Sequence, residues 1–401
     1  MPAPLTICVD LTPCEMKDRF GGFGRYGRTL VRHLLALPPD ETAGLDILAL
    51  PHSNGRPVPA GAALETSHLD EPLISSWRHH QQRRLLVGGT LRAAKVDLFH
   101  TITPAALPFQ VPCPVIATVH DIIPVVCPEP GRGPVARYRR VRDRLQQRLR
   151  LRRIDHVLAI SDTTKQDLVR TFGLARDRIS VVHHGVDTTV FTTVSDPEER
   201  ARIRARHHLP DRWILSVGSD HYRKNQERLF EAWRRVSTSI DADLVFVGKA
   251  IHDGTLGRVT AAARRAGLAD RVRWLADIGD ADLPALYRGA AVLVAPSLYE
   301  GFGMTLLEGM ACGTPVLAAR TDAHAEVAGD AATYFDPVSV DALAAALVRI
   351  TQDDILARDL RIRGLERART FTWRNAASET VTLYRRLAGR PRNRPDLRSD
   401  V

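Results

Sequence analysis

Two glutamates, Glu300 and Glu308, lie on either side of a glycine-rich turn in the stretch LYEGFGMTLLEGMACGTPV, residues 298–316. An ionised carboxylate accepts hydrogen bonds and donates none, so it suits the binding of neighbouring hydroxyl groups. Paired carboxylates also serve acid/base hydrolysis and metal binding. The residues around the pair must distinguish these three kinds of chemistry.

The turn between the two glutamates predicts an anion site. The run AAVLVAPS at residues 290–297 is typical of a buried strand, and the glycines after Glu300 delay the next helix until Met304 or Thr305. The free N–H groups at a helix start carry partial positive charge and bind phosphate. We therefore expect a sugar at Glu300, phosphates at the helix N-terminus and a ribose at Glu308. Stabilisation of the helix dipole alone would account for Glu308 but not for Glu300 and the glycines.

Short apolar runs alternate with helical patterns along the whole chain. This alternation predicts two doubly wound α/β domains whose parallel sheets are buried on both faces. The predicted domains are residues 1–192 and 193–371, followed by a helix at 372–390 and a basic tail at 391–401. The predicted strands are residues 5–10, 45–50, 96–101, 114–121, 156–162 and 179–187 in the first domain, and residues 213–219, 242–249, 271–277, 290–297, 315–320 and 332–337 in the second.

The spacing Glu300-x7-Glu308 resembles the hallmark motif of the retaining nucleotide-sugar glycosyltransferases of family 4, which have the GT-B fold. The segments GGFGRYGRTL, TVHDIIP, AISDTTKQDL, HHGVD, GSDHYRKN, AEVAGDAATYFDP and FTWRNAASETVTLY follow in the family's order, so the resemblance covers nearly the whole chain. The chain is most similar to bacterial mannosyltransferase-like members that build cell-surface polysaccharides. The resemblance implies two Rossmann-like domains facing a central cleft, with the C-terminal helix crossing back to the first domain.

A departing nucleoside diphosphate needs cationic groups to stabilise its charge. Arg223 and Lys224 follow a predicted strand, and the resemblance favours Lys224. Many family members carry an arginine directly after the strand glycine, where this chain has Ser219. The implied catalytic residues are His120, Glu300, Arg223 and Lys224. The implied donor-binding residues are Gly22, Gly218, Gly248, Gly301, Phe302, Gly303, Met304, Thr305, Leu306 and Glu308.

Two further residues are secondary candidates. The resemblance implies that His100 lies on the acceptor side. Asp121 follows His120 and either orients its ring or caps a turn.

Two Asp-x-Asp patterns, at residues 241–243 and 280–282, raise the question of a divalent cation. The first precedes a strand, at the wrong edge of the sheet. In the second, Asp280 or Asp282 is a natural helix N-cap. Both patterns are interpreted as structural, so we expect neither a metal nor another cofactor.

Residues 132–153 hold ten arginines and one acid, Asp143, within a chain of net charge +10. Such a segment either binds an anionic surface, such as lipid, or is a solvated helix face. Nucleic acid is the weakest option, since Tyr138 is the one aromatic residue in the run. The five cysteines form no CxxC pair, and no apolar run reaches the ~18 residues of a spanning helix. We expect a cytoplasmic protein, with peripheral contact to the inner face of the membrane as an open alternative.

The expected function is retaining transfer of a hexose, with mannose from GDP-mannose as the favoured donor, to a glycan or lipid-linked glycan. The resemblance implies a mechanism without a general-base side chain, in which the leaving phosphate takes the acceptor's proton. Acceptor specificity is expected in the loops at residues 75–86 and 127–140. The alternatives are a transferase that uses a UDP-sugar, an epimerase or storage-glucan synthase of the same fold, and a non-catalytic protein that binds an anionic surface.

Overall fold

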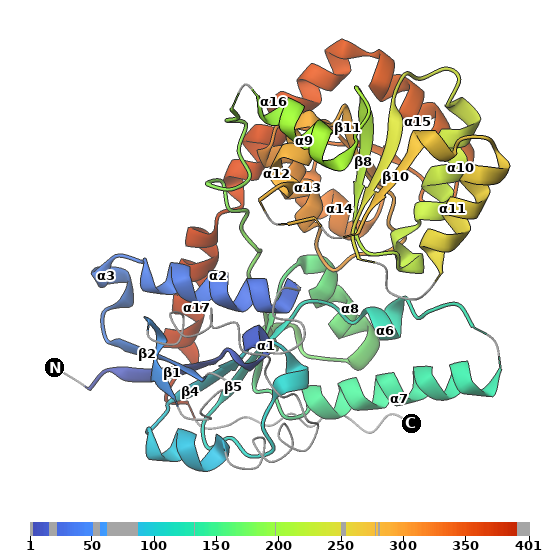
Figure 1. Ribbon diagram of the computed structural model, residues 1–401. Coiled ribbons are helices and arrows are strands. Elements are labelled where there is room, and N and C mark those ends of the chain that lie inside the picture. Colours follow the sequence, from blue (N-terminus) through green and yellow to red (C-terminus); the bar gives the residue numbers. More distant parts are fainter. Residues whose placement is uncertain are drawn as a thin grey trace. The chain divides into compact units, whose positions relative to one another are not determined.

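The computed structural model describes residues 3–15, 22–50, 57–61, 87–131, 133–196, 198–249, 254–276, 278–279 and 281–390. The contacts divide the chain into two units (Figure 1). Unit 1 comprises Met1–Gly185 and Trp373–Val401, and unit 2 comprises Val186–Thr372. The sequence places the corresponding limits after residues 192 and 371. The loop at 75–86 and the tail at 391–401 lie outside the described residues.

Unit 1 is built on a seven-stranded sheet with the order β3-β2-β1-β4-β5-β6-β7. Every neighbouring pair is parallel except β2 and β3. The strands are β1 (Leu5–Asp10), β2 (Leu45–Leu50), β3 (Val58–Pro59), β4 (Leu98–Thr101), β5 (Val115–Val119), β6 (His156–Ala159) and β7 (Ile179–Val181). The described helices are α1 (Thr12–Glu15), α2 (Gly22–Leu35), α3 (Pro39–Thr42), η1 (Pro104–Ala106), α6 (Ile123–Val126), α7 (Pro134–Leu151), α8 (Asp162–Phe172), η2 (Arg176–Arg178) and α17 (Trp373–Leu387).

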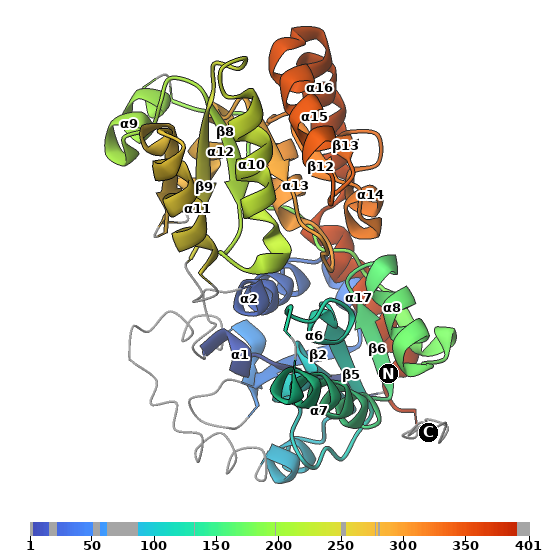
Figure 2. The ribbon, with the colours of Figure 1, turned by 90° about the vertical axis from the view of Figure 1, so that its right-hand side faces the viewer.

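Unit 2 is built on a six-stranded, wholly parallel sheet with the order β10-β9-β8-β11-β12-β13 (Figure 2). The strands are β8 (Trp213–Val217), β9 (Asp243–Val247), β10 (Val272–Leu275), β11 (Val292–Ala295), β12 (Val316–Ala319) and β13 (Thr333–Phe335). The described helices are α9 (Glu199–His207), η3 (Tyr222–Lys224), α10 (Gln226–Val236), α11 (Thr255–Arg265), η4 (Ala269–Arg271), α12 (Leu283–Gly289), α13 (Met304–Ala311), α14 (Asp322–Ala328), α15 (Val340–Gln352) and α16 (Asp354–Thr370).

The sheet of unit 1 separates two hydrophobic cores. Successive residues of a strand point to opposite faces, so Ile7 and Val9 of β1 join one core while Cys8 joins the other. All five residues of β5 are buried for the same reason. The continuous apolar runs thus correspond to strands covered on both faces, and the prediction of two doubly wound, parallel-sheet units is confirmed.

The last helix, α17, belongs to the core of unit 1. It packs against α2, and its Trp373 and Tyr384 are buried among residues of the first core. The Tyr384 hydroxyl lies 2.6 Å from Nδ1 of His100 in β4. The end of the chain therefore completes the unit that its beginning forms.

The N-cap prediction for the second Asp-x-Asp pattern is wrong in its chemistry. Asp282 precedes α12, but its carboxylate makes no hydrogen bond to the helix backbone. It accepts hydrogen bonds of 2.7 Å from Arg206 and 2.8 Å from His207 of α9 instead. Two cationic or polar partners outcompete the backbone N–H groups. Asp280 lies outside the described residues.

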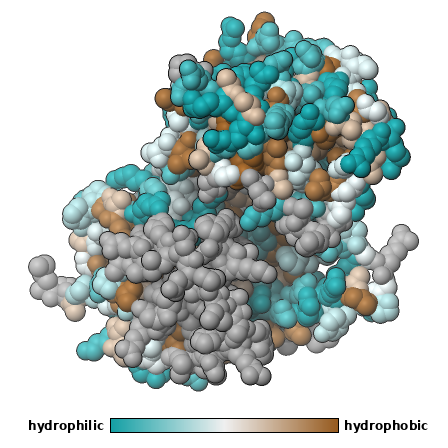
Figure 3. All heavy atoms as spheres, in the orientation of Figure 1, coloured by the Kyte–Doolittle hydropathy of each residue, from teal (hydrophilic) through white to brown (hydrophobic). Residues whose placement is uncertain are grey.

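Among the coloured atoms of Figure 3, hydrophilic side chains predominate and hydrophobic ones are scattered between them. Within the part of the chain that the structure describes, every helix is too short or too polar to span a bilayer.

Candidate functional site

The loops after β8 and β11 carry most of the predicted site residues of unit 2. These strands are parallel neighbours, so their carboxyl ends lie side by side at one edge of the sheet. A backbone hydrogen bond of 2.8 Å from Leu298 N to Arg223 O joins the two loops. The fold therefore brings Arg223 and Lys224 to the segment that precedes α13.

Glu300 lies between two cations. Its Oε1 accepts a hydrogen bond of 2.6 Å from Nζ of Lys224, and its Oε2 accepts one of 2.8 Å from Arg223. The Ser297 hydroxyl donates to Oε1 at 2.7 Å. Burial alone would raise the pKa of Glu300, but the charges of Lys224 and Arg223 hold this pKa well below its usual value. Glu300 is therefore a carboxylate at any physiological pH.

The start of α13 is open to solvent. Gly303 precedes the helix with a φ of 142°, a conformation that favours glycine. Gly303, Met304 and Thr305 are partly exposed, whereas Leu306 is buried. Gly301 and Phe302 are also buried, and the Phe302 ring packs 5.9 Å from that of Phe371. The helix begins where the sequence predicts, and its first N–H groups lie beside Glu300 in the chain.

Glu308 is 5% exposed, on the inner side of α13. The hydroxyl of Tyr287, in α12, donates a hydrogen bond of 2.8 Å to its Oε2. The sequence predicts ribose binding here, and that role stays a prediction. Tyr287 is a site neighbour that the sequence did not single out, because LPALY carries no signal beyond a helical pattern.

Gly218 and Gly248 follow β8 and β9 and approach each other closely. Their φ angles are 153° and 149°. A Cβ atom on Gly248 would lie 2.2 Å from the carbonyl oxygen of Gly218, so a larger residue does not fit. Gln226 donates a hydrogen bond of 3.0 Å to the same oxygen. Packing thus accounts for Gly248, and donor binding by either glycine stays a prediction.

In unit 1, His120 follows β5 and enters an aromatic cluster. Its Nε2 lies 3.1 Å from Ile102 O, and its ring centroid lies 4.8 Å from Tyr26 and 5.4 Å from His184. Trp373 stacks on His184 at 5.5 Å. Burial lowers the pKa of His120 to about 4, so the imidazole is neutral at pH 7.

His184, which the sequence alone favours as structural or exposed, is buried within this cluster. Gly22, the other predicted residue at this end of unit 1, is the first residue of α2.

A pocket of about 400 Å³ lies beside His120 within unit 1. Asp121 lines it, and its Oδ1 accepts a hydrogen bond of 3.0 Å from Ile123 N, as a turn-capping residue does. The remaining lining residues come from the loop after β4, from α6 and its preceding turn, and from α7: Thr103, Pro104, Ala105, Ile122, Pro124, Val125, Arg142, Asp143, Gln146, Gln147 and Arg150. Helix α7 therefore presents polar side chains to a cavity next to a predicted catalytic residue.

His100 is fully buried in β4. Its Nδ1 lies 2.6 Å from the Tyr384 hydroxyl and its Nε2 lies 2.8 Å from the Thr118 hydroxyl. Burial and the neighbouring His120 lower its pKa to about 3. Both ring nitrogens are occupied inside the core, so this geometry favours a structural role for His100 over contact with an acceptor.

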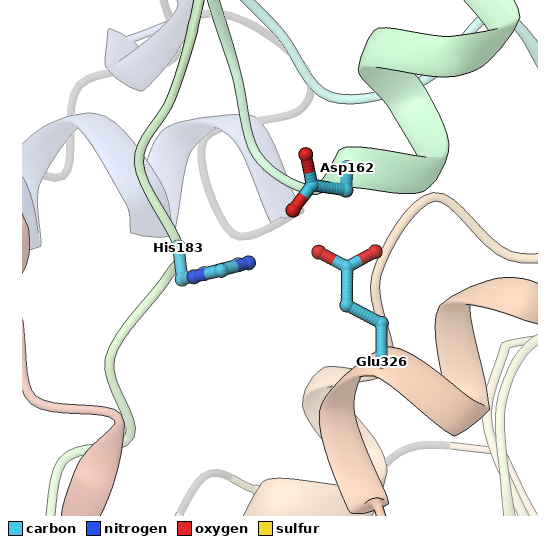
Figure 4. Close-up of side chains that lie close together, drawn as sticks. All are labelled: Asp162, His183 and Glu326. Atoms are coloured by element: carbon cyan, nitrogen blue, oxygen red, sulfur yellow. The ribbon is translucent and has the colours of Figure 1, made fainter.

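Asp162 and His183 bring a carboxylate oxygen and a ring nitrogen within 4.8 Å in unit 1. Figure 4 shows them at the start of α8 and on the chain after β7, and it also draws Glu326 of α14 in unit 2. Two ligands are fewer than a structural or catalytic metal site uses. Within unit 1 this pair does not define a metal centre.

Two α/β units built on mainly parallel sheets are the architecture of the GT-B glycosyltransferases, and the Glu-x7-Glu segment follows a strand of the second unit. The family "Glycosyltransferase Family 4" matches residues 20–190, and "Glycosyl transferases group 1" matches residues 198–367. The chain belongs to the family 4, group 1 glycosyltransferases. This membership confirms the family that the motifs indicated.

Characterised relatives include O-antigen chain mannosyltransferase B of Escherichia coli, 32% identical over 68% of this chain and 70% of the relative. MMP alpha-(1->4)-mannosyltransferase of Mycolicibacterium hassiacum is 32% identical over 69% of this chain and 66% of the relative. Among solved structures, a glycosyltransferase of Rickettsia africae has a TM-score of 0.71 at 16% identity, covering 96% of this chain and 99% of that chain. Anabaena HepE, in complex with UDP and glucose, has a TM-score of 0.71 at 17% identity, covering 96% and 100%.

Proposed function

We propose that this protein transfers mannose from GDP-mannose to a glycan or lipid-linked glycan, with retention of the anomeric configuration. The observation that carries the proposal is the Glu300 carboxylate between Lys224 and Arg223, next to the exposed start of α13. The relatives named as mannosyltransferases support the choice of sugar.

The cations and the helix start suit a diphosphate. A nucleoside diphosphate brings negative charge that Lys224 and Arg223 stabilise, together with the N–H groups of α13. In this structure Glu300 forms ion pairs with both cations. When the diphosphate takes over the cations, the carboxylate becomes available to accept hydrogen bonds from the donor sugar. Glu300 thus serves hydroxyl recognition and not hydrolysis.

Retention follows if the leaving diphosphate acts as the base. The bond from the anomeric carbon to the phosphate oxygen breaks, the bond to the acceptor oxygen forms on the same face, and the acceptor's proton passes to the phosphate. His120 is neutral at pH 7, so it offers a hydrogen bond and not a charge near the reacting centre. The pocket beside His120 is the proposed acceptor site. No metal or other cofactor is required in this scheme.

The first test is thermal unfolding of the purified protein with GDP, UDP, dTDP or ADP, with and without EDTA. We expect a rise in Tm with GDP alone, unchanged by EDTA, because a ligand that binds the folded state stabilises it. Stabilisation by UDP alone would replace GDP-mannose by a UDP-sugar as the donor. If none of the four nucleotides raised the Tm, the assignment of a donor site to unit 2 would be rejected.

Turnover of GDP-mannose, followed by NMR of the product's anomeric carbon, completes the test. The α-linked donor gives an α-linked product under retention. A β-linked product would refute the retaining mechanism while leaving the donor intact.

A further inference from the structure

Helix α7 reverses the usual arrangement of an amphipathic helix. Its apolar side chains point to solvent: Val135, Tyr138, Val141, Leu145 and Leu149 are 67%, 66%, 61%, 54% and 49% exposed. These five residues form the apolar stripe of α7. In Figures 1 and 2 the helix runs along the outside of unit 1.

The stripe is continuous because its members recur every three or four residues. From Tyr138 the steps to Val141, Leu145 and Leu149 are three, four and four, which keeps the side chains on one face of a helix. The opposite face packs on the protein and is polar. Asp143, Gln147 and Arg150 there are less exposed and line the pocket beside His120.

Core packing does not explain this pattern. A helix that served the core alone would bury its leucines and valines and expose its charges. Only Leu151, at the end of α7, is buried. The sequence therefore keeps large apolar side chains in water along most of the helix, and such a patch indicates a binding surface.

The charge of the helix identifies the partner. Residues 132–153 contain ten arginines and one acid. That acid, Asp143, accepts a hydrogen bond of 2.7 Å from Arg142. By helical spacing Arg137, Arg144 and Arg148 flank the stripe on one side, and Arg142 flanks it on the other. An apolar stripe between rows of arginine fits a surface that is apolar within and anionic at its boundary.

We propose that α7 docks this protein on an anionic lipid bilayer. The apolar stripe enters the boundary between headgroups and acyl chains, and the flanking arginines contact lipid phosphates. The helix lies in the plane of the surface and does not span the membrane. Docking needs no donor, so it stands apart from the proposed function.

Two other occupants fit the surface less well. A second copy of the chain would place one arginine-rich helix against another across a two-fold interface, which brings like charges together. A nucleic acid would contact the arginines but leave the apolar stripe in water, and Tyr138 is the one aromatic side chain on it that could stack on a base.

Docking through α7 would also determine how a lipid-linked acceptor reaches the enzyme. The inner face of the helix lines the pocket beside His120 while the outer face meets the bilayer. An acceptor sugar attached to a lipid would thereby reach the pocket from the membrane to which the enzyme is bound. This consequence, unlike docking itself, rests on the proposed function.

The test is sedimentation of the full chain with vesicles of phosphatidylcholine alone and of phosphatidylcholine with phosphatidylglycerol. We expect binding to the anionic vesicles only. The double variant Val141→Glu/Leu145→Glu should weaken that binding by more than about tenfold, because it removes apolar contact and adds negative charge. The matched control is Ile355→Glu/Ile362→Glu on α16 of unit 2, where the side chains are 83% and 53% exposed. The control should bind like the parent protein.

A second variant separates insertion from charge attraction. Leu145→Trp should show a blue shift of its own emission with anionic vesicles, measured against the parent protein, because the indole leaves water. Arg137→Gln/Arg144→Gln should weaken binding and reduce its salt dependence.

Any of the following results would overturn the proposal: no sedimentation of the parent protein, equal binding by the Val141/Leu145 double variant, no blue shift, or a dimer in light scattering that this variant dissociates. Tight binding to RNA without binding to vesicles would do the same.

Discussion

At the scale of single residues, Glu300 is the counter-ion of the two cations that are proposed to bind the diphosphate. Lys224 and Arg223 are 16% and 18% exposed in their side chains, so their charges are partly desolvated and need a counter-ion. Glu300 supplies it while no anion is bound. Under the proposed function, the same carboxylate competes with the donor's diphosphate for two cations. Its effects on stability and on ligand affinity should have opposite signs.

The variant Glu300→Gln tests this competition. It keeps the shape of the side chain but leaves two partly buried cations without their counter-charge, so unit 2 should lose about 1–3 kcal/mol of stability. Calorimetric titration with GDP should show affinity equal to or higher than that of the parent protein, because the cations are released. Turnover should fall by at least about a hundredfold, since the sugar loses its ionised acceptor.

Two controls accompany this variant. Lys224→Met should weaken GDP binding, because it removes a cation and not the competitor. Glu231→Gln also removes a carboxylate that pairs with two arginines, but Glu231 is 34% exposed and lies on α10. It should change stability by less than about 1 kcal/mol. Weaker GDP binding by Glu300→Gln would contradict the competition.

At the scale of elements, the loops after β8 and β9 set the shape of the site's edge. Position 248 has no room for a side chain, because a Cβ there would collide with the carbonyl group of Gly218. The side chain of Lys224 in turn packs beside Gly218, where a Cβ would lie 3.0 Å from it. Displacing one loop therefore moves the other, and Lys224 with them.

The variant Gly248→Ala should destabilise unit 2 by about 2–4 kcal/mol. Its Cβ would lie 2.2 Å from Gly218 O, and its φ of 149° is strained for alanine. We expect a lower midpoint in urea unfolding and weaker GDP binding, because the loop that carries Lys224 has to shift.

The matched control is Gly257→Ala on α11, where a Cβ would meet nothing within 4 Å. Alanine is favoured over glycine in a helix interior, so this variant should be as stable as the parent or more so, by up to about 1 kcal/mol. If both variants behaved alike, close approach would not be the reason for glycine at position 248.

The elements that could be predicted from sequence are those whose pattern is local. Strands such as β5 and β11 are continuous apolar runs, and the start of α13 is marked by its glycines. The strand β3 was missed because two residues, one of them Pro59, make no pattern. Its antiparallel pairing depends on β2, which lies elsewhere in the chain.

The parts of the site that escaped prediction depend on contacts between distant residues. Tyr287 reaches Glu308 from another helix, and Trp373 reaches His184 from the end of the chain. The same holds for Asp282, whose position was recognised but whose partners in α9 were not. Motifs predict which residues meet a ligand, whereas tertiary packing determines which protein groups hold those residues in place.

At the scale of the whole molecule, the two units differ in their buried histidines. Unit 1 holds His100, His120, His156 and His184, and burial is the first cause that lowers the pKa of each. The pKa of His156 falls to about 4, with Arg386 adding to the effect of burial. Among the described residues of unit 2, His324 alone has such a lowered pKa. Acid should therefore affect the two units unequally.

The sign of this effect follows from linkage. A histidine whose pKa is lower in the folded state takes up its proton first in the unfolded state. Its stabilising contribution is present above the unfolded pKa of about 6.5 and is lost as pH falls toward the folded value. His120 and His156, with folded pKa values of about 4, should each cost about 1–2 kcal/mol between pH 7 and pH 5. Unit 1 should therefore become the less stable unit in mild acid.

Hydrogen exchange with mass spectrometry at pH 7 and pH 5, corrected for the intrinsic exchange rate, measures both units in one sample. Peptides from β4, β5 and β6 should lose protection at pH 5, while those from β8 and β11 should lose less. His156→Gln removes one titrating ring at the edge of the core, so it should reduce the difference between the two pH values in unit 1 and leave unit 2 unchanged. Equal loss of protection in both units would mean that carboxylates, and not the buried histidines, determine the response to acid. His120, a predicted catalytic residue, is one of these rings. If acid unfolds unit 1 first, turnover should therefore fall at a higher pH than GDP binding does.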